Sequence, residues 1–365
     1  MSTLRLVHSI LAIFLLISLL TPIMRIATPV NAEQIVISVS DPEGDDRGPG
    51  YYGYPKAEVF KPGVFDLVRF EVLLNDTHVI FRVYYKNLGG NPWNGPNGFC
   101  LQYTQIYIRT TEKGLLGRMD TIGANVVLRP DYAWYYALLL APGWDTEAVP
   151  VGQKAALYYS NGTIVVQDSG FNVYADMKAN AIIAVVPRSL LSDLDHIANW
   201  SIVVLALSYD GFGPMRVRPV SVTGGDWVIN GSAYATTDQV KRLAKAITAG
   251  VEPRVMDLLI YSPEYRNGVT ADQQYKWLDS FDPDKMTPAT IPYTPTVLTV
   301  TTTYTTTQTV TTTQTSLMTT TYTTTLISTT TTTTTVTTVD WTTTSVVGVV
   351  LLVIGFLIGF FARRK

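Results

Sequence analysis

Residues 67–73 and 78–85 read LVRFEVL and HVIFRVYY, and the segment between them contains Asn75-Asp76-Thr77. Both runs are rich in β-branched and aromatic residues, which favour strands. Asn and Asp favour the tight turns that join antiparallel strands. This stretch therefore predicts a β-hairpin with its turn at Asn75-Asp76.

Short strand-like runs separated by turn residues continue on both sides of this hairpin. Asn161-Gly162, between residues 155–159 and 163–166, is the strongest short hairpin signal in the chain. The other runs that predict strands are residues 34–39, 105–108, 134–140, 182–186 and 201–207. Helical patterns are sparse and are found at residues 237–248 and 270–278. We therefore predict an all-β domain with short helices, a β-sandwich, over residues 33–293.

The two ends of the chain predict export and membrane attachment. Residues 1–32 have a basic start, a short apolar run and a small residue at Ala32, as a secretory signal peptide does; an uncleaved anchor is the alternative. Residues 345–362 are apolar and are followed by the basic residues 363–365, which predicts one transmembrane helix with a short cytoplasmic tail. We expect a single-pass cell-membrane protein with its amino-terminal domain outside.

Residues 294–344 are mostly threonine, and Asp340 is the only charged residue among them. Such a composition is typical of a disordered, O-glycosylated stalk that lifts a domain away from the membrane. A strand region is the alternative, because β-branched threonine favours strands.

Composition limits the partners and the cross-links of the chain. The formal net charge is −2, so no basic surface for nucleic acid is predicted. The single cysteine, Cys100, excludes a disulfide within the chain. Four sites match the N-glycosylation pattern: Asn75, Asn161, Asn199 and Asn230.

An acidic, glycine-rich loop follows the first predicted strand. It reads DPEGDDRGPGYYGYP over residues 41–55. Crowded carboxylates repel one another unless a cation lies among them, and hard oxygen ligands suit Ca²⁺. The predicted calcium ligands are Asp41, Glu43, Asp45, Asp46 and Asp66, the last at the start of the next strand. The alternative is a solvated acidic turn.

Aromatic residues form the second candidate site. Rings with a polar atom suit the apolar face of a sugar, although most of the rings in the chain are expected to fill the core of the sandwich. The residues that we select as carbohydrate-binding are Tyr52, Tyr54, Trp93 and Phe99. Trp93 is the most distinctive of them because it lies in a loop, NPWNGP, at residues 91–96.

Catalysis finds little support in the sequence. After the predicted signal, the chain contains only two histidines, His78 and His196, and they are far apart. Carboxylate pairs for glycoside hydrolysis, Asp145 with Glu147 or Asp193 with Asp195, need a particular separation across a cleft. We therefore predict no enzymatic activity and no catalytic residue.

Three groups of motifs resemble the C-terminal binding module of glucodextranase, which is also found in archaeal amylopullulanases and surface proteins. The motifs are the acidic loop with Tyr54-Pro55 and Phe65-Asp66, then Asn91-Pro92-Trp93 with Gly98-Phe99, and finally YDGFG at 209–213 with Arg216, Arg218 and Trp227. The resemblance implies a β-sandwich of the DOMON or immunoglobulin-like kind that binds polysaccharide or cell-envelope glycan. In that family the module often accompanies a separate glycosidase domain, and we expect none here.

We expect a membrane-anchored extracellular glycoprotein that binds carbohydrate or attaches to the cell envelope, with a calcium-organised loop. One alternative is a self-associating, S-layer-like envelope component. The other is a hydrolase that acts on surface or environmental α-glucan.

Overall fold

The computed structural model describes residues 33–148, 152–293, 297–314 and 320–337, and the chain separates into one unit that ends at Ile291 and another that begins at Pro292. The predicted signal peptide (1–32), membrane segment (345–362) and basic tail (363–365) lie outside the described residues. Among the described residues, no helix has the length and apolar character needed to cross a bilayer.

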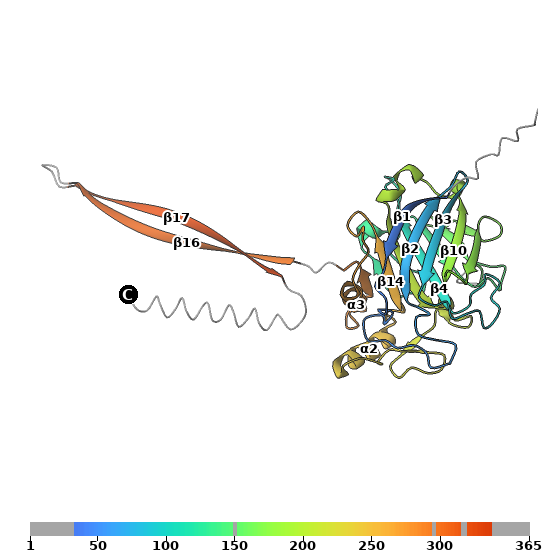
Figure 1. The fold of residues 1–365 in the computed structure, drawn as a ribbon. Helices are drawn as coiled ribbons and strands as arrows, with labels where there is room; N and C mark the ends of the chain where they lie inside the picture. Colours follow the sequence, from blue (N-terminus) through green and yellow to red (C-terminus); the bar gives the residue numbers. More distant parts are fainter. Residues whose placement is uncertain (1–32, 149–151, 294–296, 315–319, 338–365) are drawn as a thin grey trace, which may run out of the picture. The chain divides into compact units, whose positions relative to one another are not determined.

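The first unit is a sandwich of two antiparallel sheets (Figure 1). The five-stranded sheet has the order β1 (Gln34–Ser40), β2 (Leu67–Leu74), β3 (His78–Tyr85), β10 (Ala181–Pro187) and β9 (Asn172–Asp176). The six-stranded sheet has the order β14 (Asp257–Tyr261), β11 (Ser201–Ser208), β4 (Gln102–Arg109), β6 (Tyr136–Leu140), β7 (Ala156–Tyr159) and β8 (Ile164–Val166). The predicted β-rich class is confirmed.

The predicted hairpin is present as β2 and β3, which pair antiparallel. Its turn is stabilised by the side chain of Asn75, whose Oδ1 accepts hydrogen bonds from the backbone N–H groups of Thr77 (3.0 Å) and His78 (2.7 Å). The second hairpin, β7 with β8, also forms around Asn161-Gly162. Local turn chemistry therefore fixes both registers.

The central strands of the six-stranded sheet are buried on both faces. One face meets the other sheet, where Phe70 and Phe81 stack with ring centroids 6.4 Å apart. The opposite face packs against Trp277 and Leu278 of α3 (Ala271–Leu278) and against the short parallel pair β5 (Val126–Leu128) and β15 (Ala289–Ile291). This double coverage explains why β11 is apolar almost throughout (SIVVLALS) rather than alternating.

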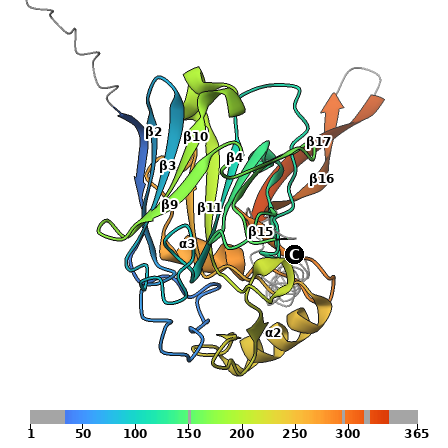
Figure 2. The same ribbon diagram turned by 90° about the vertical axis from the view of Figure 1, so that its right-hand side faces the viewer.

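A third apolar cluster lies beyond one end of the sheets. It joins the loop at residues 51–65 to Leu243 of α2 (Thr237–Ala249) and to the short strands β12 (Val220–Ser221) and β13 (Ile229–Asn230). Figures 1 and 2 both place α2 beyond that end of the sandwich. Both α2 and α3 begin with a capping box, at Thr236 and Thr270, which explains why these two short helices were predictable.

The threonine-rich segment differs from the disordered stalk that its composition predicts. Its described residues form two strands, β16 (Val297–Gln314) and β17 (Thr320–Thr337), which pair antiparallel from Val297 opposite Thr337 to Gln314 opposite Thr320. Threonine is β-branched and has a high strand propensity, which accounts for this outcome.

Candidate functional site

Carboxylates from four places in the chain meet at one end of the sandwich. Asp41 follows β1, Asp45 lies in the loop beyond it, Asp66 directly precedes β2, and Asp257 is the first residue of β14. Ligand oxygens of Asp41, Asp45 and Asp257 all lie within 4.8 Å of one another. We call Asp41, Asp45, Asp66 and Asp257 the acid cluster.

Backbone groups hold two of these carboxylates in place. Asp257 accepts hydrogen bonds from the backbone N–H of Leu67 (2.7 Å) and from that of Leu258 (2.8 Å). Asp66 accepts one from the N–H of Gly44 (2.9 Å). Gly44 has a φ of +86°, a left-handed conformation that favours glycine, so its place in the loop matches its residue type.

A buried glutamine of α3 supports the same loop. Gln274 donates from Nε2 to the backbone oxygen of Asp45 (2.7 Å) and accepts from the N–H of Leu258 (2.9 Å). Since Gln274 is fully buried, both bonds form away from solvent. This one side chain therefore connects the acidic loop, β14 and α3.

Burial dominates the electrostatics of the acid cluster. It raises the pKa of Asp45 to about 7 and that of Asp66 to about 6. Burial, followed by the charges of Asp45 and Asp66, holds the pKa of Asp41 well above its usual range. Burial and then the charge of Asp41 do the same for the pKa of Asp257. The site thus disfavours negative charge unless a cation compensates it.

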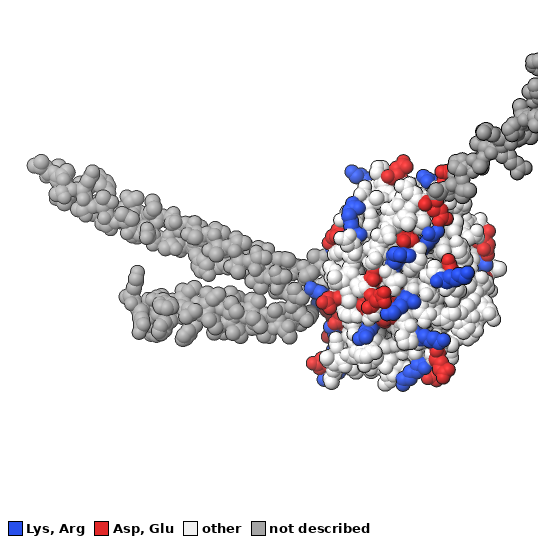
Figure 3. All heavy atoms as spheres, in the orientation of Figure 1, with Lys and Arg blue, Asp and Glu red and all other residues white. Residues whose placement is uncertain are grey.

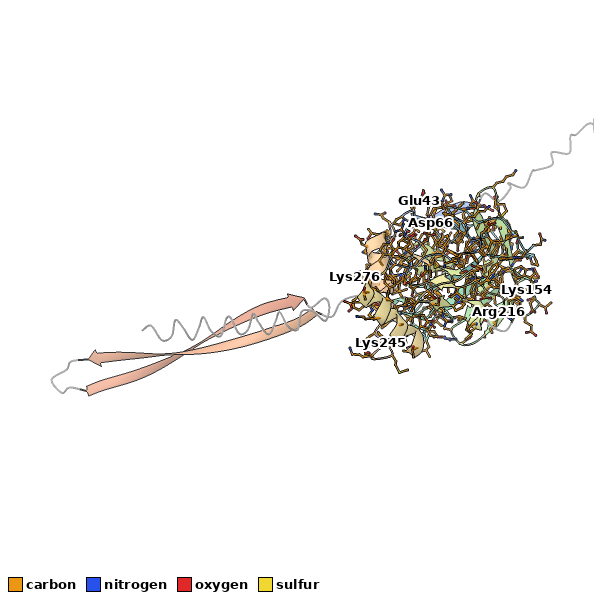
Figure 4. All side chains as sticks on the ribbon, turned by 90° about the horizontal axis from the view of Figure 1, so that it is seen from below. Glu43, Asp66, Lys154, Arg216, Lys245 and Lys276 are labelled. Atoms are coloured by element: carbon orange, nitrogen blue, oxygen red, sulfur yellow. The ribbon has the colours of Figure 1, made fainter. Side chains whose placement is uncertain are left out.

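Three of the five predicted metal ligands lie in the acid cluster: Asp41, Asp45 and Asp66. Asp46 instead accepts a hydrogen bond from the hydroxyl of Tyr54. Glu43 is exposed and pairs with Lys86 at 3.1 Å, on the same side of the domain as Asp66 (Figure 4).

The sequence did not predict that Asp257 lies in the acid cluster. It lies 190 residues beyond Leu67 in the sequence, the residue whose N–H it accepts, and no local motif surrounds it.

Rings line an open groove of about 700 Å³ at the same end of the sandwich. Loops that follow β3, β6 and β11, together with the turn between β12 and β13, supply its walls. Its lining includes Trp93, Trp144, Tyr209, Phe212, Arg218 and Trp227. We call this surface the tryptophan groove.

The tryptophans of the groove are held in pairs but remain partly exposed. Trp93 is 42% exposed and lies 5.9 Å from Trp227, which is 50% exposed, measured between ring centroids. Trp144, 38% exposed, lies 5.8 Å from Tyr209. Phe212 is fully exposed in the next loop. Large apolar rings left in contact with water mark a surface that binds something.

A buried arginine holds two loops of the groove in place. Arg218 donates to Ser208 Oγ (2.9 Å) and to the backbone oxygens of Trp227 (2.8 Å) and Tyr209 (2.7 Å). Its guanidinium also lies 4.9 Å from the ring centroid of Phe60. These contacts set the relative positions of two ring-bearing loops. Arg218 is part of the motif that follows YDGFG in the sequence, but its role in positioning these loops was not predicted.

The four predicted carbohydrate-binding residues separate into two accessible and two buried rings. Trp93 lines the tryptophan groove, and Tyr54 lines an adjacent hollow of about 430 Å³. Tyr52 and Phe99 are 1% and 0% exposed and belong to the core, so a glycan cannot reach either ring. Whether an aromatic ring is buried depends on packing against segments that are distant in the sequence, and a local motif does not reveal it.

Aromatic contacts connect the two hollows. Tyr54 packs against Phe65 (5.1 Å), Phe65 against Phe60 (6.2 Å), and Phe60 against Trp227 (5.9 Å). Because Tyr54 also donates to Asp46, this chain of rings runs from the edge of the acid cluster to the groove.

The glycosylation candidates differ in exposure. Asn161 and Asn199 are exposed, whereas Asn75 and Asn230 are half-buried. The sole cysteine, Cys100, is buried beside the tryptophan groove, and burial raises the pKa of its thiol to about 11, which makes the thiol unreactive.

Both candidate carboxylate pairs have local partners. Asp145 accepts from the backbone N–H of Glu147 (3.0 Å). Asp193 accepts from Thr111 and contacts His196.

A β-sandwich whose loops present an open, ring-lined groove at one end has the architecture of a ligand-binding module. The model of the family described as the C-terminal binding module, SLH-like, of glucodextranase matches residues 36–293, and the chain belongs to this family. No curated protein matches the chain. The match covers the sandwich, the acid cluster and the tryptophan groove, and the family is a binding module rather than a catalytic one.

Proposed function

We propose that the sandwich binds a polysaccharide or envelope glycan through the tryptophan groove. The observation that carries this proposal is the pairing of Trp93 with Trp227 in a groove that leaves both rings about half exposed. Flat rings match the apolar faces of pyranose units, and the nearby Asp210 and Gln153 supply groups that can hydrogen-bond to hydroxyls.

In this proposal the protein acts by attachment and has no catalytic activity. The family match supports a binding role. The apolar segment 345–362 supports anchorage in the cell membrane, with the threonine-rich segment as spacer and the sandwich outside the cell. The lining of the groove contains one acidic and one basic residue, Asp210 and Arg218, which suits a neutral ligand better than a highly charged one. Acidic and basic side chains are also interspersed over the face of the sandwich that Figure 3 shows.

Affinity electrophoresis of the full chain, purified in detergent, tests the glycan proposal. Gels that contain an α-glucan, a β-glucan or a mannan are compared with a gel without polysaccharide. We expect retardation by at least one of them, and about tenfold weaker binding for Trp93→Ala and for Trp227→Ala, equivalent to ~1.4 kcal/mol.

Tyr174→Ala is the matched control, because Tyr174 is an aromatic residue of β9 that is 47% exposed and lies outside the groove. Its retardation should equal that of the unmodified protein. Absence of retardation in every gel, or retardation that survives both tryptophan substitutions, would contradict the proposal.

A further inference from the structure

The acid cluster has more negative charge than its surroundings can compensate. Its four carboxylates are 8%, 3%, 1% and 0% exposed at Asp41, Asp45, Asp66 and Asp257. The only salt bridge to them within the described residues joins Lys86 to Asp66, over 3.8 Å, and Lys86 is exposed. Buried charges of like sign without a close counter-charge are strongly destabilising.

Several of these oxygens also lack a hydrogen-bond donor. Within the part of the chain that the structure describes, no group donates to either carboxylate oxygen of Asp41, to Oδ1 of Asp45 or to Oδ1 of Asp66. Asp41 is more than nine-tenths buried, and its ligand oxygen lies within 4.8 Å of those of Asp45 and Asp257. An unsatisfied buried carboxylate of this kind indicates a missing electropositive partner.

We propose that the acid cluster is a calcium site in which Asp41, Asp45 and Asp257 are the central ligands and Asp66 completes the set. Ca²⁺ binds oxygen at 2.3–2.6 Å, so ligands on opposite sides of the ion stand about 5 Å apart. The 4.8 Å limit on the three ligand oxygens fits that span. Mg²⁺ keeps several waters and is usually bound through one or two carboxylates, so four buried carboxylates suit it less well.

The ligand chemistry also favours calcium over transition metals. Every member of the acid cluster is a carboxylate, with no histidine or cysteine among them. Zinc favours nitrogen and sulfur ligands, whereas calcium accepts carboxylates in irregular geometry. The ion would join the end of β1, the start of β2 and the start of β14, and so would connect the two sheets.

The rival explanation is that the carboxyl groups are protonated and share their protons. The two explanations differ in their response to metal, because only a metal site is stabilised by added calcium. This inference does not depend on glycan binding by the tryptophan groove.

Thermal unfolding of the full chain in detergent at pH 7.5 separates the two explanations. After exhaustive chelation, the unfolding temperature is measured in EGTA, in excess Mg²⁺ and in excess Ca²⁺. We expect calcium to raise it by about 5 °C or more, and magnesium to raise it much less. Calorimetric titration of the chelated protein with calcium should reveal a saturable site.

Asp41→Asn should abolish the calcium-dependent rise, whereas Glu43→Gln, two residues away but exposed, should retain it. If Asp41→Asn fails to fold, the calorimetric titration of the unmodified protein still decides the question. No rise and no binding heat with calcium, or an equal rise with magnesium, would overturn the proposal.

Discussion

The acid cluster and the tryptophan groove lie at the same end of the sandwich. They depart in opposite ways from the usual pattern, in which charged groups are exposed and large apolar rings are buried. The acid cluster buries carboxylates such as Asp41 without enough donors, and the groove exposes rings such as Trp227 that could have been buried. Each departure has a cost in free energy that a bound partner can offset. The comparison teaches that one partner would not serve both sites: the proposals assign an ion to the acid cluster and a glycan to the groove.

The pH dependence of stability should distinguish the two sites most strongly. In a chelated protein, Asp45 has a pKa of about 7 when folded, against about 4 for an unfolded aspartate. Between these values the folded state holds more protons than the unfolded state. The free energy of unfolding therefore falls as pH rises from about 4 to 7, by an amount on the order of 3–4 kcal/mol for this shift alone.

Urea unfolding from pH 4.5 to 8, with EGTA or with calcium, measures this dependence. The neighbouring charges are those of Asp41, Asp46, Asp66, Asp257 and Lys86. Bound calcium should replace protons on the carboxylates. The two curves should therefore diverge as pH rises, with calcium giving the flatter one. Parallel curves would mean that the metal does not bind at these carboxylates.

Gln274→Ala should destabilise the acid cluster and leave the tryptophan groove unchanged. The substitution removes two buried hydrogen bonds, from Gln274 to the backbone oxygen of Asp45 and from the N–H of Leu258 to Gln274, and leaves a space where the side chain was. We expect a loss of about 2–3 kcal/mol in the free energy of unfolding. Lys276→Ala, on the exposed side of the same helix, is the control and should change stability by less than about 0.5 kcal/mol.

Glycan affinity of Gln274→Ala, measured below its unfolding transition, should match that of the unmodified protein. A loss of affinity as large as that of Trp227→Ala would show that the two regions behave as one unit.

Sequence reasoning succeeded where the determining interactions are local. The β2–β3 hairpin follows from an Asn side chain that bonds to residues two and three positions away, and the capping box of α2 spans four residues. The acidic loop was found for the same reason, because its carboxylates are crowded in sequence. Crowding in the sequence thus indicated that Asp41 and Asp45 lie close together, as they do in the structure.

The remainder depended on contacts between distant segments. Asp257 reaches the acid cluster only because β14 lies at the edge of the second sheet. Trp144 was not predicted because its loop is far in sequence from Trp93, although both line one groove. Tyr52 and Phe99 have the same residue types as accessible sugar-binding rings, and only tertiary packing reveals that they are buried.

Arg218→Met should weaken glycan binding about tenfold without removing any exposed ring. The substitution deletes the three hydrogen bonds that fix Trp227 and Tyr209 relative to Ser208. Misplaced rings lose part of their contact with the ligand, and a tenfold change corresponds to ~1.4 kcal/mol. The measurement is affinity electrophoresis, together with tryptophan fluorescence as a report on ring environment.

Arg266→Met is the matched control, because Arg266 bonds to Ala198 and Asn199 and lies outside the groove. Unchanged affinity in Arg218→Met, with altered fluorescence, would mean that the rings adapt to the ligand and do not need to be held in place by Arg218.

The smallest expected effect is the influence of calcium on glycan affinity. A path of contacts runs from Asp46 through Tyr54, Phe65 and Phe60 to Trp227, so order at the acid cluster can be transmitted to the groove. The groove does not use any carboxylate of the acid cluster as a wall. Chelation should therefore weaken glycan binding by only about threefold, less than 1 kcal/mol.

Phe60→Leu interrupts the path at its middle while keeping an apolar side chain, and should remove the effect of chelation on affinity without removing the calcium-dependent rise in unfolding temperature. Binding that is lost completely in EGTA would indicate that calcium contacts the glycan directly. The acid cluster and the groove would then be two parts of one site. Loss of an ion that only orders the neighbouring loop should cost less affinity than loss of a ring that contacts the glycan.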